Sequence, residues 1–115
     1  MKHKMDELYY TICEKKTADP KGSYTAQLLD GGTDTIAQKV GEEAVETIIE
    51  AICKRKNGLI YESVDLLYHL MVLWADSNIK LEDIWDEMAK RSIESGLDCL
   101  LYTSDAADEG LGVDL

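Results

Sequence analysis

The sequence predicts an all-α fold, an antiparallel bundle of about four helices. Three observations support this prediction. Apolar residues recur at intervals of three and four along most of the chain, which is the spacing of an amphipathic helix. The 115 residues include a single proline, Pro20. The alternation of apolar and polar residues that is typical of a half-buried strand does not persist over a useful length.

The first expected helix begins near Met5, because Met5, Leu8, Tyr9, Ile12 and Cys13 form one stripe. It should end near Lys16, before a loop over residues 18–22 that contains proline and glycine. Ser23 can cap a short helical piece through Leu29, and residues 30–34 form a second break.

A long helix is expected from about Thr35 to Lys56, with Asn57-Gly58 as its C-terminal stop. A third long helix should span Leu59 to Asp76 and end at Ser77-Asn78. Leu81, Ile84, Trp85 and Met88 mark a fourth, which runs to about Arg91. The short connections favour antiparallel neighbours.

Composition excludes several classes of protein. The formal charge of −11 argues against nucleic acid or an anionic membrane as the main partner, because both attract clustered cations. No apolar run is long enough to span a membrane, and the N-terminus lacks the apolar stretch of a secretory signal. Three widely spaced cysteines, Cys13, Cys53 and Cys99, indicate reduced thiols and a cytoplasmic protein.

The last residues differ in character from the rest. Residues 99–115 contain four acids, no base and no sustained amphipathic period. The first ten of them can be back-translated as TGT CTC TTA TAC ACA TCT GAC GCT GCC GAC, which resembles a sequencing-library adapter read in frame. We therefore expect a domain over residues 1–98, and a disordered, non-native read-through tail over 99–115 in place of the natural C-terminus. The alternative is a disordered native tail.

Acidic residues gather on one side of the helix expected over residues 35–56. At about 100° per residue, one arc of that helix collects the side chains of Lys39, Glu42, Glu43, Glu46 and Glu50. A solvated helix face is the simplest explanation for such an arc when this helix is considered alone.

The helix expected over residues 59–76 favours a different explanation. It is apolar around nearly its whole circumference, so it should be buried on most sides, yet Glu62, Asp65 and His69 share one narrow arc of it. A buried carboxylate needs a cation, a metal or strong donors. If the two acidic faces meet, hard oxygen ligands favour Mg²⁺, with Mn²⁺ as an alternative. A buried salt-bridge network with Lys39, Lys54 or Arg55 remains open.

The spacing Glu42-Glu43-x-x-Glu46, followed later by Glu62-x-x-Asp65, resembles the metal signature of the all-α nucleotide pyrophosphatase superfamily. Three blocks narrow the resemblance to the phosphoribosyl-ATP pyrophosphatase family of histidine biosynthesis. They are Ala18-Asp-Pro-Lys-Gly-Ser-Tyr-Thr-Ala26, Ile36-Ala-Gln-Lys-Val-Gly-Glu-Glu-Ala-Val-Glu46 and Asp65-Leu-Leu-Tyr-His-Leu70. The resemblance covers roughly residues 5–98.

This resemblance implies Mg²⁺-dependent hydrolysis of phosphoribosyl-ATP between its α- and β-phosphates, giving phosphoribosyl-AMP and pyrophosphate. It also implies a homodimer, which the apolar circumference of the third long helix favours independently. Carried onto matching positions, it implies a metal-binding set of Glu42, Glu43, Glu46, Glu62 and Asp65. Glu43 and Glu46 are the candidates for a catalytic role, since a glutamate that is not fully engaged by metal can take a proton from water.

Several further residues are candidates for contact with the substrate. Lys39 can bind a phosphate, or it can form an ion pair with Glu43 one turn away. Tyr24 and Thr25 can donate hydroxyl hydrogen bonds to the substrate, and Arg91 can contact a phosphate. His69 is either a satisfied core residue or a residue that orients the Asp65 carboxylate.

Two other functions remain open at the level of sequence. One keeps the metal site but acts on ordinary or damaged nucleoside triphosphates, as a house-cleaning pyrophosphatase of the same fold. The other is a non-catalytic helical dimerisation module whose acidic residues are merely solvated. The block Gly22-Ser-Tyr-Thr-Ala26 favours phosphoribosyl-ATP over the first of these alternatives.

Overall fold

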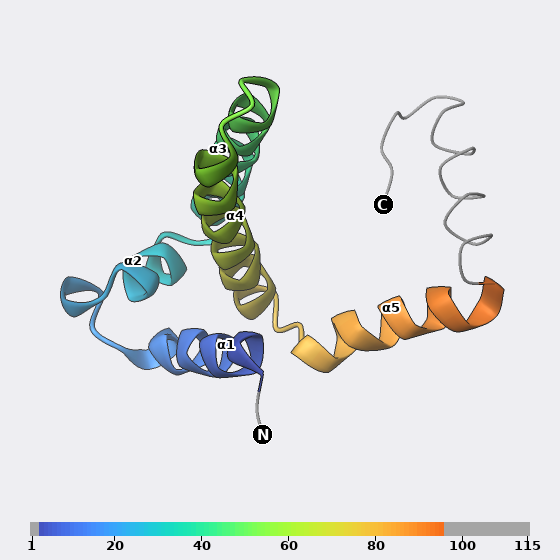
Figure 1. Cartoon of the computed structure of the whole chain (residues 1–115). Helices are drawn as coiled ribbons and strands as arrows, with labels where there is room; N and C mark the ends of the chain where they lie inside the picture. Colours follow the sequence, from blue (N-terminus) through green and yellow to red (C-terminus); the bar gives the residue numbers. More distant parts are fainter. Residues whose placement is uncertain (1–2, 96–115) are drawn as a thin grey trace. The chain divides into compact units, whose positions relative to one another are not determined.

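The computed structural model describes residues 3–95, and this part of the chain contains helices and turns but no strand (Figure 1). The all-α prediction is therefore confirmed over these residues. The chain divides into two compact units, residues 1–79 and 80–115. The first contains α1 to α4, and α5 belongs to the second.

Helix α1 spans Lys4–Glu14, in agreement with the predicted stripe. His3 caps it by accepting a hydrogen bond from the Met5 amide, and Asp6 accepts one from the His3 amide, which satisfies two otherwise unpaired donors. Tyr9 and Ile12 are buried, and two short 3₁₀ turns follow at Lys15–Thr17 and Pro20–Gly22.

Helix α2 spans Tyr24–Gly31 and begins where the sequence predicts. The Ser23 hydroxyl accepts a hydrogen bond from the Ala26 amide at 3.2 Å, so Ser23 is a helix cap. Gly32 ends α2 with a φ of 88°, a conformation that a residue with a side chain rarely adopts. Helix α3 starts directly afterwards.

Helices α3 (Thr33–Ile52) and α4 (Lys56–Asp76) form a helical hairpin in which the two lie side by side (Figure 1). The turn between them comprises residues 53–55, so the predicted stop at Asn57-Gly58 is wrong. Lys54 has a φ of 60°, and the amides of Lys54 and Arg55 bond back to the carbonyls of Ala51 and Glu50. This is the Schellman arrangement, with lysine in the place that glycine usually occupies.

The C-terminal half of α4 forms the centre of the first unit. Met71, Val72 and Ala75 are buried there. The Tyr9 ring of α1 meets Trp74 edge-on, and its hydroxyl donates a hydrogen bond to the Ile79 carbonyl. These contacts fix α1 against the end of α4.

The other half of the hairpin leaves apolar side chains in contact with solvent. We call this set the hairpin apolar surface: Val45, Ile48, Ile49, Ile52, Ile60, Tyr61 and Val64, each between 45% and 71% exposed. The expectation that α4 is buried on most sides is therefore wrong for its N-terminal half within a single chain. The α3 members follow a helical stripe, so they present one continuous face.

Helix α5 spans Leu81–Ser95 and extends past the predicted end at Arg91. The expected read-through tail, residues 99–115, lies outside the described residues. Among the helices of residues 3–95, none combines the length and the apolar character needed to cross a membrane.

Candidate metal centre

Three carboxylates converge between α3 and α4. Glu43 comes from α3, and Glu62 and Asp65 come from successive turns of α4. An oxygen of each lies within 4.8 Å of an oxygen of both others. The hairpin thus brings together three of the five acids that the sequence predicts as metal ligands.

The environment of this cluster fits a bound cation. Glu43 is only 6% exposed, and Glu43 Oε2 and Glu62 Oε1 are both buried without a hydrogen-bond partner in the described part of the chain. Buried acceptors that lack a donor carry a substantial free-energy cost. Oxygen donors alone are the ligands that hard divalent ions prefer, so these three residues can hold such an ion.

Crowding also alters the acidity of the cluster. Burial raises the pKa of Glu62 to about 7, and repulsion from the carboxylates of Glu46 and Glu43 acts in the same direction. Glu46 itself is exposed on α3. It therefore flanks the three-carboxylate cluster on the side of Glu62.

Glu42, the remaining predicted ligand, points toward other partners. It is exposed and accepts a hydrogen bond from Gln38 Nε2 at 3.1 Å, and Lys39 Nζ lies 3.4 Å from its carboxylate. These two interactions lower the pKa of Glu42. Glu42 is thus stabilised as an anion at the edge of the cluster.

Lys39 supplies the positive charge closest to these acids. Its Nζ lies 3.6 Å from Glu43 as well as 3.4 Å from Glu42. Desolvation lowers the pKa of Lys39, but the hydrogen bond to Glu42 and the attraction of Tyr24 and the carboxylates outweigh it, so the pKa is raised. Lys39 lies at the rim, and Glu43 Oε2 and Glu62 Oε1 find no hydrogen-bond partner among the described residues.

Glu50 and Arg55 form a separate pair at the hairpin turn. Arg55 donates to both oxygens of Glu50, at 2.6 Å from Nη2 and at 3.0 and 3.2 Å from Nε. This pairing lowers the pKa of Glu50. Glu50, which the sequence places in the acidic arc of this helix, is therefore paired with Arg55 at the turn and does not belong to the three-carboxylate cluster.

His69 is buried, with 4% of its surface exposed. Its Nδ1 lies 2.8 Å from the backbone carbonyl oxygen of Asp65, and its Nε2 lies 3.0 Å from the Tyr24 hydroxyl. The ring thus contacts the main chain of Asp65, and both of its nitrogens have partners, so His69 is the satisfied core residue of the two alternatives that the sequence left open. Tyr24 is half exposed beside it.

Tyr68 is a residue of this region that the sequence analysis missed. Its hydroxyl forms a hydrogen bond with the Thr25 hydroxyl, so Thr25 has a partner within the chain. Its ring stacks on Tyr24, with centroids 6.4 Å apart. Tyr68 follows Asp65 by three residues, and this helical spacing could have placed it on the side of α4 that faces α2.

Arg91, another predicted contact for phosphate, lies on α5 and pairs with Glu87 at 3.0 Å. It belongs to the second unit.

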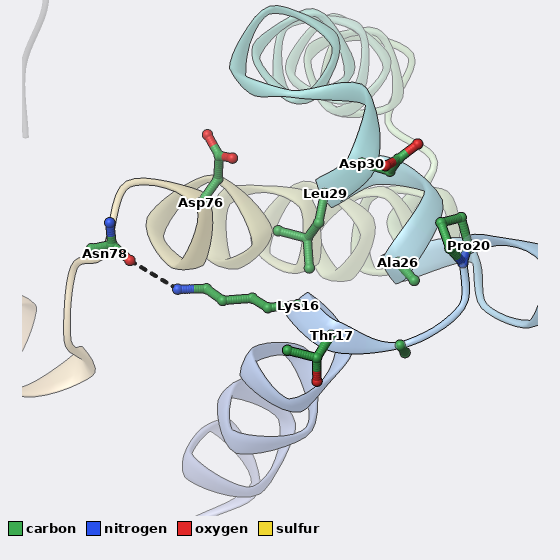
Figure 2. A pocket seen from close by; sticks show the side chains of 9 residues that line it. Lys16, Thr17, Pro20, Ala26, Leu29, Asp30, Asp76 and Asn78 are labelled. Atoms are coloured by element: carbon green, nitrogen blue, oxygen red, sulfur yellow. Dashed lines mark hydrogen bonds between the residues drawn. The ribbon is translucent and has the colours of Figure 1, made fainter.

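A cavity of about 470 Å³ occurs in the first unit, where the loop after α1 meets α2 and the end of α4 (Figure 2). Lys16 reaches across to Asn78, with Nζ 3.0 Å from Oδ1, and Asp76 accepts a hydrogen bond from Thr33. None of the predicted site residues lines the cavity. Asp76 is three turns beyond Asp65, about 16 Å along the helix, so this cavity is separate from the carboxylates.

Comparison with known proteins identifies the family of this chain. The family model of phosphoribosyl-ATP pyrophosphohydrolase matches residues 5–92. The phosphoribosyl-ATP pyrophosphatase of Azospirillum brasilense is 54% identical over 93 residues, which are 81% of this chain and 84% of the relative. The enzyme of the same name from Paramagnetospirillum magneticum is 49% identical over 94 residues, 82% of this chain and 86% of the relative. The range matched by the family model spans the positions of Glu43, Glu62 and Asp65, and the chain belongs to the phosphoribosyl-ATP pyrophosphohydrolase family.

Proposed function

We propose that this chain hydrolyses phosphoribosyl-ATP to phosphoribosyl-AMP and pyrophosphate, an early step of histidine biosynthesis. Membership of the family and the names of the curated relatives support this activity. Within the molecule, the observation that supports this activity is that Glu43, Glu62 and Asp65 meet between two helices. An acidic protein can act on a triphosphate when a cation separates the like charges.

We propose Mg²⁺ as the ion, with Mn²⁺ as the alternative, held by Glu43, Glu62 and Asp65. Their donor atoms are all oxygens, and two of these are buried with no hydrogen-bond partner among residues 3–95. Glu46 and Glu42 adjoin the three and would complete the set through substrate or water. When bound, a divalent ion neutralises phosphate charge and polarises the phosphorus under attack.

The exposed carboxylate of Glu46 is the proposed general base. It lies next to Glu62 and outside the close group of three, so it can accept a proton while the others are engaged. In the reaction a water oxygen forms a bond to phosphorus, the bridging P–O bond between the α- and β-phosphates breaks, and the water proton passes to the carboxylate. Glu43, which is buried and contacts Lys39, is the second candidate.

Lys39 is the proposed phosphate contact. Its ammonium is partly exposed at the rim of the cluster, and its raised pKa keeps it charged. A phosphate oxygen can replace Glu42 or Glu43 as its partner when the nucleotide binds.

The test is pyrophosphate release from phosphoribosyl-ATP, with and without Mg²⁺, alongside a panel of ordinary and damaged nucleoside triphosphates. We expect Mg²⁺-dependent release from phosphoribosyl-ATP. Asp65→Asn and Glu46→Gln should reduce turnover by at least about a hundredfold, whereas Glu14→Gln on the exposed face of α1 should leave it unchanged.

Each other outcome assigns a different function. Turnover of the nucleoside triphosphates alone would indicate the house-cleaning activity. A protein without Mg²⁺ response, in which both cluster variants behave as the parent, would be an interaction module.

We also propose that the chain forms a homodimer through the hairpin apolar surface, which exposes seven large apolar side chains on adjacent helices. Apolar patches of this kind usually mark an interface. Sedimentation at micromolar concentration should give a dimer, and Ile52→Glu should shift it to monomer. Gln27→Glu, an equal charge change at an exposed position of α2, should not. A parent protein that sediments as a monomer would contradict the proposal.

We also propose a cytoplasmic location, from the thiols, the substrate and the net charge. Cys13 and Cys53 are free thiols, which persist in a reducing compartment. The substrate is a free nucleotide, and the net charge of −11 disfavours binding to nucleic acid or to an anionic membrane.

A further inference from the structure

A line of hydrogen bonds connects the backbone of α4 to the rim of the carboxylate cluster. The carbonyl oxygen of Asp65 can only accept, so the His69 nitrogen 2.8 Å away, Nδ1, must carry a proton. In the neutral imidazole the other nitrogen, Nε2, is then an acceptor. The Tyr24 hydroxyl at 3.0 Å therefore donates its proton to His69.

This arrangement fixes what Tyr24 can offer to a ligand. A tyrosine hydroxyl has one proton, and here that proton is directed inward to a buried ring. The oxygen keeps only its capacity to accept. The aromatic rings hold it in place, since Tyr24 stacks on Tyr68 at an interplanar angle of 23° and meets His69 edge-on at 80°.

The position of Tyr24 indicates the part of the ligand that it meets. The residue is 50% exposed, and it is one of the groups that raise the pKa of Lys39, the proposed phosphate contact. A phosphate oxygen is itself an acceptor and cannot bond to an oxygen that has no proton to give. The ribose adjoins the α-phosphate of a nucleotide, and its hydroxyl groups are donors.

We propose that Tyr24 selects the sugar of the nucleotide by accepting a hydrogen bond from a ribose hydroxyl, and that His69 is the positioning residue that keeps Tyr24 in this role. The proposal rests on the nucleotide-hydrolysing function above. It differs from the expectations drawn from the sequence, in which Tyr24 donates to the substrate and His69 is either a satisfied core residue or orients the Asp65 carboxylate.

The tautomer of His69 can be tested without substrate. The chain has two histidines, His3 and His69, so nitrogen-detected NMR of the imidazole side chains can be assigned with a single His69→Gln variant. We expect a proton on Nδ1, which faces the Asp65 carbonyl, and none on Nε2, which faces the Tyr24 hydroxyl. Tyr24→Phe should shift the Nε2 resonance and leave Nδ1 protonated. A proton on Nε2 in the parent protein would overturn the proposal.

Sugar recognition is tested by the binding of AMP, 2′-deoxy-AMP and 3′-deoxy-AMP in the presence of Mg²⁺. One of the two deoxy forms should bind the parent protein about three- to tenfold more weakly than AMP. Tyr24→Phe should lose a similar factor for AMP and should no longer distinguish that deoxy form. Equal binding of all three nucleotides to the parent would overturn sugar recognition by Tyr24.

A matched set of variants isolates the role of His69. His69→Phe removes the acceptor and should reproduce the loss seen in Tyr24→Phe, and the double variant should be no weaker than either single one. His69→Gln, which retains an acceptor, should recover part of the affinity. Independent, additive losses would overturn the positioning role. Tyr24→Phe, at a half-exposed site, keeps the test valid if His69→Phe does not fold.

These results are separable from a failure of the proposed function. Absence of pyrophosphate release by the parent protein would overturn the function, whereas the tautomer and the comparison among the AMP forms are measured without turnover.

Discussion

At the scale of single residues, the crowding of acids should make stability depend on pH. The pKa of Glu62 is about 7 in the folded chain, whereas an unperturbed glutamate titrates near about 4.3. Between these values the folded state holds a proton that the unfolded state has lost. The free energy of unfolding should therefore fall as pH rises through this window when no metal is present.

Chemical unfolding at several pH values with a chelator present checks this prediction. Glu62→Gln removes the titrating group, so its stability should fall less between pH 5 and 7 than that of the parent, by the arithmetic of proton linkage. Glu14→Gln is the matched control and should keep the slope of the parent. Identical slopes for all three proteins would contradict a raised pKa at Glu62.

How far the sequence predicts the site depends on which forces fix each residue. Glu62 and Asp65 share a helix face by spacing alone, so their neighbourhood was predictable. The bond between Thr25 and Tyr68 joins α2 to α4, and no local pattern encodes such a contact. The orientation of the His69 ring is also hard to predict. The carboxylate and the backbone carbonyl of Asp65 can both accept a hydrogen bond from it, and residue spacing does not decide between them.

At the scale of secondary-structure elements, the helices were predictable and one boundary was not. The periodic stripes located α1, α3, α4 and α5, whereas Asn57-Gly58 suggested a stop that lies inside α4. Glycine fits there for a tertiary reason, because a Cβ at Gly58 would lie 1.8 Å from Glu50 Oε1. The left-handed residue of the turn is Lys54, which no composition rule favours.

This turn leads to a prediction about stability. Lysine in a left-handed conformation costs about 1 kcal/mol or more relative to glycine, so Lys54→Gly should raise the free energy of unfolding by roughly 0.5–1 kcal/mol after the entropy of glycine is included. Lys56→Gly, at the first residue of α4, should give no gain. Denaturant unfolding of both variants measures the difference, and a loss of stability in Lys54→Gly would contradict the assignment of this turn.

At the scale of the whole molecule, metal binding should appear as stability. An ion that binds only the folded state adds about 2.7 kcal/mol when its concentration is a hundredfold above Kd. We expect Mg²⁺ to raise the Tm of the parent beyond the effect of equal ionic strength from NaCl.

Asp65→Asn should remove most of this increase in Tm. The variant should be no less stable than the parent without metal, because one of three repelling charges is gone. An undiminished response to Mg²⁺ in Asp65→Asn would place the ion elsewhere.

The three carboxylates that meet at the cluster all belong to one hairpin, whose two helices are joined by a turn of residues 53–55. Contacts between segments so near in sequence close quickly. The ion-binding half of the protein can thus assemble while α1 is still undocked, and a divalent cation would then act on a nascent chain as well as on a finished enzyme. Refolding from denaturant should accelerate when the cation is already in the buffer.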